Sequence, residues 1–326
     1  MTSDSENLSE RFDLSNLGRP DLYSTYRELL EEAPVYWSPS LAGWYLSKHA
    51  FVVGSFRDSR LSANRLAPVF NRMPEAQRRA LDPLASAIGR WTLVMDPPDH
   101  TRMRMLIVKA FTPRLIEGLE PKIRPIVDRL LAAPVERGEM DVVRDLAYPL
   151  PATVIALMLG VPVDDIDILK RWSDDLAEFF GLATFGRDKV LATQATIVAM
   201  GDYFRDLIAE HRRRGRNDLL SRLIEAREAG EVLDDDELVA TVIMLVFAGH
   251  ETTTNLIANA VLTLDRHPDE RRRVAADPSL LPAVVEEVLR FESPVQRLSR
   301  MAAEDFTVGG RHIERGQRIF LLTGAA

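Results

Sequence analysis

The stretch Val242-Ile-Met-Leu-Val-Phe-Ala-Gly249, followed at once by His250-Glu-Thr-Thr-Thr254, decides the fold that this sequence predicts. The first eight residues carry no polar side chain, and a helix that is apolar on every side is buried on every side. Acidic residues at 234–237 precede it, where the helix dipole favours negative charge, and the helical pattern continues to residue 265. About 30 residues at 1.5 Å each give roughly 45 Å, long enough to cross a domain.

The polar residues that follow this apolar run are candidates for chemistry. A carboxylate and three hydroxyls inside a buried helix are costly unless they are paired, and buried ionisable groups gather at functional sites. Glu251 beside Thr252 could pass protons to a reacting group, and small Ala248 and Gly249 would let a ligand approach the helix. The alternative is a buried helix with a satisfied polar kink, because threonine can bond to the carbonyl four residues earlier.

Most of the remaining sequence also has helical spacing of apolar residues. Helices are predicted at 20–34, 97–111, 113–133, 145–159, 164–180, 188–214, 218–228, 268–276 and 279–291. Short strands are predicted at 35–37, 44–46, 304–308, 311–313 and 317–322, and residues 54–95, with three prolines, are expected to be irregular. We therefore predict a mainly α fold with small β-sheet elements, forming a single domain over residues 1–326.

Composition narrows the class of protein. None of the 326 residues is a cysteine, which rules out disulfides, thiolate metal sites and cysteine nucleophiles within this sequence and is typical of a reducing compartment. The 41 basic residues are outnumbered by 49 acidic ones, so a nucleic-acid partner is not expected. Residues 1–10 are polar and acidic, unlike a signal peptide, and the run 242–249 is too short to span a bilayer. We expect a cytoplasmic protein with no membrane contact.

Two clusters of charged residues lie away from the central helix. His100 and Arg104 are four residues apart and are expected on one helix face with Met103, where they could bind an anion such as a carboxylate or form an ordinary basic surface. Glu287 and Arg290 have the spacing of an ion pair on one helix face. His250-Glu251 is not a zinc motif, because Thr254 stands where the second histidine should be.

The order of these features along the chain is more specific than any one of them. Four blocks carry a resemblance, namely Asp96-Pro-Pro-Asp-His-Thr-Arg-Met-Arg104, Ala248-Gly-His-Glu-Thr-Thr253, Glu287-Val-Leu-Arg290 and Arg300-Met-Ala-Ala-Glu-Asp305. With these blocks the sequence resembles a bacterial cytochrome P450, the haem-thiolate monooxygenase family, from about Phe12 to Ala326. The resemblance implies the P450 fold and the hydroxylation or epoxidation of a small to medium apolar substrate, such as a secondary metabolite.

The resemblance also implies a role for each matched residue. His100, Arg104 and Arg300 would bind the haem propionates, and Ala248 and Gly249 would lie over the distal haem face, where oxygen binds. Glu251 and Thr252 look like the acid–alcohol pair that delivers protons to that oxygen. Glu287 and Arg290 look like the family's structural ion pair.

Substrate and partner are implied less directly. Residues 61–95 fall where the family lines its substrate pocket, and so do Phe179, Met244, Phe247, Val295 and Leu298. Electrons would come from a ferredoxin-type donor on the proximal side, where Arg102 and Lys109 could supply positive charge.

One feature of the family is missing from these residues. The cysteine that ligates the iron lies, in the family, beyond the position of Ala326. One interpretation is a shortened chain of a monooxygenase, which the retained Glu251 and Thr252 favour. The other is a haem-free relative that binds and activates a glycosyltransferase. In the family, the residues around this cysteine also cover the proximal side of the haem site. Without them, the helices at 241–249 and 279–291 are expected to expose apolar surface.

Overall fold

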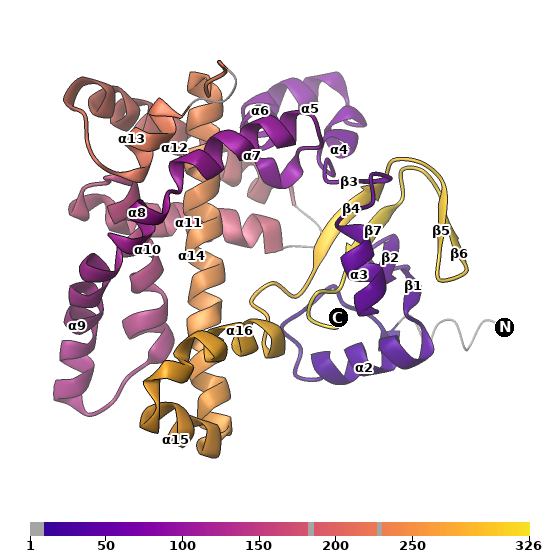
Figure 1. Ribbon diagram of the computed structural model, residues 1–326. Helices are drawn as coiled ribbons and strands as arrows, with labels where there is room; N and C mark the ends of the chain where they lie inside the picture. The colour runs from indigo at the N-terminus through magenta and orange to yellow at the C-terminus, as the bar shows by residue number, and fades with distance from the viewer. Residues whose placement is uncertain (1–9, 182–185, 227–229) are drawn as a thin grey trace.

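The computed structural model describes residues 10–181, 186–226 and 230–326. The N-terminal stretch before Glu10 and the last two residues of the helix predicted at 218–228 lie outside the described part. The protein is mainly helical, with a five-stranded sheet on one side of the long helix α14 (Asp235–Arg266) and the helices labelled α8 (Pro113–Glu117), α9 (Glu120–Arg137), α10 (Pro149–Leu159), α12 (Arg187–Arg214) and α13 (Leu219–Glu225) on the other, as Figure 1 shows. The predicted fold class is confirmed.

Helix α14 begins and runs as its sequence indicates. At its N-terminus the Glu237 backbone N–H donates to the Asp234 carboxylate at 2.7 Å, and the Glu237 carboxylate accepts from the Asp234 N–H at 3.0 Å. This capping box satisfies two backbone donors that the first helical turn would leave free. The apolar run behaves as predicted in its first part, since Val242, Ile243 and Val246 are at most 1% exposed.

The helices around α14 build the larger hydrophobic cluster. They are α6 (Asp82–Gly89), α7 (Asp99–Ala110), α10, α11 (Ile166–Gly181), α12 and α13, and α9 packs on α10 outside this cluster. Helix α15 (Pro268–Ala276) and α16 (Leu281–Phe291) follow α14 along the chain. The helix predicted at 113–133 is divided into α8 (Pro113–Glu117) and α9, and Pro121 lies in the first turn of α9. The start of the helix predicted at 145–159 is instead a π-helix at Val142–Ala147, which ends where Pro149 and Pro151 open α10.

The prediction that residues 54–95 are irregular is wrong. Between α3 (His49–Ser55) and a 3₁₀ turn at Thr92–Val94 lie β3 (Leu61–Ser62), α4 (Ala67–Asn71), α5 (Glu75–Ala80) and α6. Pro68, Pro74 and Pro83, which we expected to break structure, lie at helix N-termini instead. Proline is tolerated there because the first backbone N–H groups of a helix have no partner within the helix.

The main sheet joins strands from both ends of the chain. Its order is β1 (Val35–Ser38), β2 (Gly43–Leu46), β7 (Arg318–Leu321), β4 (Leu298–Ala302) and β3. Strand β2 pairs with β7 in parallel, and this close approach requires glycine at position 43, because a Cβ there would lie 2.8 Å from the Phe320 ring. Strands β5 (Phe306–Val308) and β6 (Arg311–Ile313) form a separate hairpin, as predicted. The apolar pattern does not predict strand β4, because its sequence, Leu-Ser-Arg-Met-Ala, has no alternation of apolar and polar residues.

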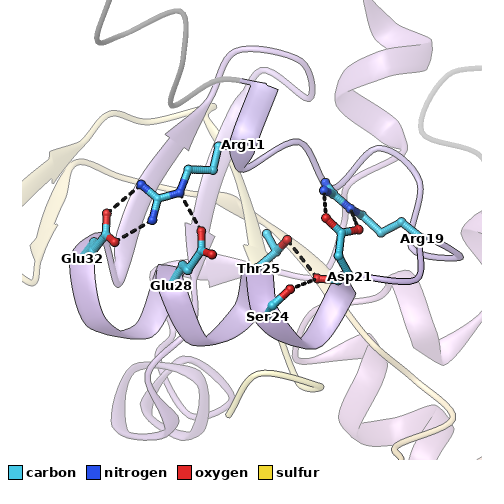
Figure 2. A network of polar contacts seen from close by, with 7 residues as sticks. All are labelled: Arg11, Arg19, Asp21, Ser24, Thr25, Glu28 and Glu32. Atoms are coloured by element: carbon cyan, nitrogen blue, oxygen red, sulfur yellow. Dashed lines mark hydrogen bonds and ion pairs between the residues drawn. The ribbon is translucent and has the colours of Figure 1, made fainter.

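Helix α2 (Leu22–Glu32) holds the segment before it through ion pairs. Figure 2 shows Arg11 between Glu28 and Glu32, with the shortest nitrogen–oxygen distance to each at 2.6 Å. Arg19 pairs with Asp21 in the same view. These side chains are partly exposed, so each pair contributes little to stability, and their main effect is to orient the segment beside the sheet.

One stretch, Val142–Leu159, is long and apolar enough to cross a membrane by length and composition alone. It combines the π-helix with α10, and both contact α14. Ala152, Ile155 and Leu159 from this stretch belong to the protein core.

Candidate functional site

Thr252 and Thr254 satisfy their hydroxyls within α14. The Thr252 Oγ1 donates to the Ala248 carbonyl at 2.6 Å, and the Thr254 Oγ1 donates to the His250 carbonyl at 3.0 Å. The back-bonding expected from the sequence is therefore present. A hydroxyl that donates one hydrogen bond keeps lone pairs that can accept another, so Thr252 can still receive a hydrogen bond from a ligand.

Glu251 has no such partner. Its carboxylate makes no hydrogen bond or ion pair with any residue in the described part of the chain, although the residue is half-buried. Burial raises the pKa of Glu251, and the negative charge of Asp174 raises it further. Glu251 borders a pocket of about 240 Å³, and a carboxyl whose pKa is raised holds its proton closer to neutral pH.

Ala248 and Gly249 face different neighbours. Ala248 and Thr252 are four residues apart and share one side of α14. A Cβ built on Gly249 would lie 3.7 Å from the Ile155 Cδ1 on α10. That is ordinary van der Waals contact, so packing against α10 does not itself require glycine at this position.

The expected anion-binding pair on α7 lies beside a hollow. His100 and Arg104 line a pocket of about 330 Å³ together with Thr101, Met105, Val108 and Lys109. We expected Met103 on the same face, and this is wrong. Its side chain is fully buried in the helical core. Arg102 faces the start of α14, where its guanidinium binds the Glu237 carboxylate and lies 3.5 Å from that of Glu231.

Arg300 lies on β4 with a neighbour that the sequence analysis missed. Burial, together with the charges of Arg300 and Arg318, lowers the pKa of Arg65 to about 10. None of these three arginines makes an ion pair with a described residue; Arg65 donates to the Leu93 carbonyl at 3.2 Å and Arg300 to the Ser299 carbonyl at 2.9 Å. Partly buried cations without a counter-ion suit an anionic ligand. Arg65 was missed because residues 54–95 were treated as an irregular stretch.

Glu287 and Arg290 form the ion pair that their spacing predicts. The Arg290 Nε and Nη2 donate to the two Glu287 oxygens at 2.8 and 2.6 Å, and both side chains are exposed. Within residues 10–181, 186–226 and 230–326, no group of three or more acidic, histidine or cysteine side chains could hold a metal ion.

The candidate pocket residues divide between two hydrophobic clusters. Phe179, Met244 and Phe247 belong to the helical cluster, whereas Leu298 packs against the sheet cluster. Val295, in the link before β4, is half-buried, and its carbonyl accepts hydrogen bonds from the Ser293 and Thr323 hydroxyls.

Trp91 is a second residue that the sequence analysis did not single out. It is fully buried and stacks on Phe180 and Phe247, with ring centroids 5.3 and 5.6 Å away. Its indole N–H has no partner in the described structure, and an orphan buried donor is unusual. Its only sequence signal is a large aromatic residue shortly before the Asp96 block.

Comparison with known proteins identifies the class. The Cytochrome P450 family profile matches residues 69–326. Cytochrome P450 107B1 of Saccharopolyspora erythraea is 38% identical over 313 residues, which cover 94% of this chain and 75% of that protein. Vitamin D(3) 25-hydroxylase of Pseudonocardia autotrophica is 38% identical over 308 residues, covering 93% and 73%. The chain belongs to the cytochrome P450 monooxygenase family.

Solved structures agree on the fold. P450BioI in complex with an acyl carrier protein ligated to hexadec-9Z-enoic acid superposes with a TM-score of 0.84 at 34% identity, covering 93% of this chain and 76% of that one. CalO2 superposes with a TM-score of 0.85 at 32% identity, covering 95% and 77%.

Family membership implies haem, and the described residues match it in part. The cations at Arg65, Arg300 and Arg318 without counter-ions, and the pocket beside His100 and Arg104, fit the carboxylates of such a group. The family's iron ligand is absent from these 326 residues, because they contain no cysteine to supply a thiolate. These residues therefore fit the propionate groups of haem, whereas the axial iron ligand is not among them.

Proposed function

We propose that this chain carries the residues that support oxygen activation in a haem-dependent monooxygenase, which hydroxylates or epoxidises a small to medium apolar molecule. The observation that carries this proposal is the pair formed by an unpartnered Glu251 with a raised pKa and the adjacent Thr252 hydroxyl on a buried helix. A structural helix has no need for a half-buried carboxyl without a partner. When bound, haem supplies the iron at which oxygen is activated.

The protein side chains have two tasks in this proposal. His100, Arg104 and Arg300 bind the haem carboxylates, and Arg65 adds a further positive charge beside Arg300. Such contacts fix the orientation of a planar ligand, because a guanidinium binds a carboxylate through two parallel hydrogen bonds.

Glu251 and Thr252 hold and move the proton. A protonated Glu251 carboxyl gives its proton toward the Thr252 side of α14, and Thr252 Oγ1 accepts a hydrogen bond there while it donates to Ala248. A carboxyl is an efficient proton donor when its pKa approaches the working pH, and the raised pKa of Glu251 has that effect.

The aromatic cluster around Trp91 supports an apolar substrate. Trp91, Phe180 and Phe247 contact one another, and Met244 accepts a hydrogen bond from Thr92 at 3.3 Å beside them. The vitamin D(3) 25-hydroxylase and the fatty-acyl complex of P450BioI are named for apolar molecules. We propose that Phe179, Met244, Phe247, Val295 and Leu298 line the substrate pocket and that a ferredoxin-type protein donates electrons.

Two proteins test the axial-ligand requirement. The chain alone, reduced and exposed to carbon monoxide, should not give the thiolate-type difference spectrum, because it has no cysteine. A fusion to the segment of Cytochrome P450 107B1 that follows the matched region should give it. That spectrum from the chain alone would contradict the proposal.

The same fusion tests the proton pair. Thr252→Ala should raise oxygen consumption relative to product, because the hydroxyl that accepts at the reacting group is lost. Thr252→Ser keeps a hydroxyl and should retain most of the coupling. Equal coupling in all three proteins would remove Thr252 from the relay.

A second candidate function rests on the missing cysteine. A haem-free relative that binds and activates a glycosyltransferase would need no thiolate. Haem titration of the chain and of Arg300→Ala separates the two functions. Saturable binding that weakens in the variant favours the monooxygenase, and no binding by either the chain or the fusion favours the haem-free protein.

A further inference from the structure

The pocket beside Glu251 connects this half-buried carboxyl with an exposed one. Its lining residues come from α11, α14 and the turn before α10, and they are Tyr148, Asp174, Ala177, His250, Glu251, Thr254 and Asn255. Asp174 and Asn255 are exposed, whereas Glu251 is half-buried. The volume of about 240 Å³ exceeds the roughly 30 Å³ that one water molecule occupies in the liquid, so the pocket has room for water between the two carboxyls.

The outer carboxyl is fixed in place. The Tyr148 hydroxyl donates to the Asp174 Oδ2, which links the start of α10 to α11. The Tyr148 ring packs edge-on against the His250 ring at 4.8 Å, and the Tyr148 carbonyl lies 3.1 Å from the His250 Nε2. Asp174 is therefore held toward the pocket by a residue that also contacts α14.

His250 does not compete for this role. Burial lowers its pKa, so the ring is neutral near pH 7. Its Nε2 faces a carbonyl, which can only accept, so the proton of the neutral ring is assigned to Nε2. Lys170 is a further charged group near the pocket, and its Nζ lies 5.9 Å from the Tyr148 ring centroid and pairs with Asp167 at 2.9 Å.

We propose that Asp174, positioned by Tyr148, is the outer carboxyl that supplies Glu251 with protons from solvent. This inference rests on the proposed function of Glu251 as the proton donor of the site. Asp174 takes one proton from solvent, releases it through pocket water to the Glu251 carboxylate, and returns to its anionic form. Glu251 then gives one proton to the Thr252 side. One proton enters for each one that leaves, and no electron moves in this exchange.

The position of Asp174 also accounts for the direction of transfer. When Glu251 loses its proton, two carboxylates face one pocket with no cation between them among the described residues. Their repulsion favours the return of a proton to Glu251, and the Asp174 charge contributes to the raised pKa of Glu251.

The first test uses the chain itself and requires neither haem nor turnover. Carboxyl titration by infrared difference spectroscopy, with Glu251→Gln as the reference that identifies the Glu251 band, is compared between the wild-type chain and Asp174→Asn. We expect the titration midpoint of Glu251 to fall in Asp174→Asn. Asp167→Asn removes one negative charge from the same helix outside the pocket lining and should leave the midpoint unchanged. An equal midpoint in Asp174→Asn and wild type would overturn the inference.

The second test follows proton delivery in the fusion protein. Asp174→Asn should slow the proton-dependent step several-fold and raise its solvent isotope effect, a smaller loss than the roughly 100-fold expected for a group that acts directly. Tyr148→Phe, which frees Asp174 but keeps its charge, should show an intermediate loss. A rate and isotope effect equal to those of wild type in Asp174→Asn would contradict the inference.

The two proposals fail in different ways. If Glu251→Gln leaves coupling in the fusion unchanged, the proposed function of Glu251 is wrong whatever Asp174 does. If Glu251→Gln uncouples the fusion while Asp174→Asn changes neither the Glu251 midpoint nor the rate, only the inference about Asp174 is wrong.

Discussion

Glu251 and Thr252 are adjacent in the chain, yet α14 gives them different surroundings. Successive helical residues point about 100° apart, since a turn holds 3.6 residues. Thr252 therefore bonds back to Ala248, and Glu251 faces the pocket that it shares with Asp174. The sequence predicts both residue types and the buried helix, but not Asp174, because residues far apart in sequence meet only through the packing of α11 on α14.

The raised pKa of Glu251 predicts a pH-dependent stability. The folded state binds this proton more tightly than the unfolded state, whose carboxyl titrates near 4.5. The free energy of unfolding should therefore fall as pH rises from about 4.5 through the folded pKa. In Glu251→Gln this fall should be absent, so the variant should be more stable than wild type at pH 7 and nearly equal to it at pH 4. Urea denaturation at both pH values measures the difference, and an equal difference at both would contradict the prediction.

Trp91 predicts a large packing effect. Trp91→Ala should cost about 3–5 kcal/mol of unfolding free energy, because a fully buried aromatic side chain stacked on Phe180 and Phe247 leaves a cavity. Trp91→Phe removes the unpartnered indole N–H and keeps a ring, so its loss should be clearly smaller. Chemical denaturation of both variants is the measurement, and equal losses would contradict a packing role for the ring.

At the scale of elements, helix bounds were predicted well in a segment without internal proline and poorly in a segment with several prolines. Helix α14 has no internal proline, a strong acidic start and a long apolar run, so its bounds are predicted within about one residue. Between residues 54 and 95 the same rule failed, because Pro68 and Pro83 begin short helices instead of ending them. Helices of five to eight residues hold too few apolar positions for a periodic pattern, and tertiary packing decides them.

The N-terminal cap of α14 gives a prediction at this scale. Asp234→Ala should destabilise the protein by about 1 kcal/mol, because the backbone N–H of Glu237 loses its acceptor. Asp234→Asn keeps a side-chain oxygen at the cap and should lose much less. Thermal unfolding of the two variants measures the contrast, and a loss of the same size in both would point to charge and not to the cap.

For the whole molecule, the sequence predicted exposed apolar surface on two helices, and only one shows it. Residues 241–244 and 246 are buried under α10, α11 and α12, so the prediction for that part of α14 is wrong. On α16 the exposed fractions of Leu281, Val285 and Leu289 are 50%, 49% and 38%. The apolar pattern of a helix does not say which of its sides neighbouring helices cover, because that depends on packing between distant segments.

The apolar row on α16 predicts how the chain behaves in solution. Leu281, Val285 and Leu289 are spaced by four, so they form one continuous stripe along the helix. Water-exposed stripes of this kind favour association, so the chain should bind a hydrophobic dye and form concentration-dependent oligomers. Val285→Lys combined with Leu289→Lys should reduce both. Val135→Lys, at an apolar residue 76% exposed on α9, changes charge equally per site and should have little effect. A wild-type chain that stays monomeric and binds little dye, as measured by sedimentation and fluorescence, would show that the α16 stripe is too small to drive association.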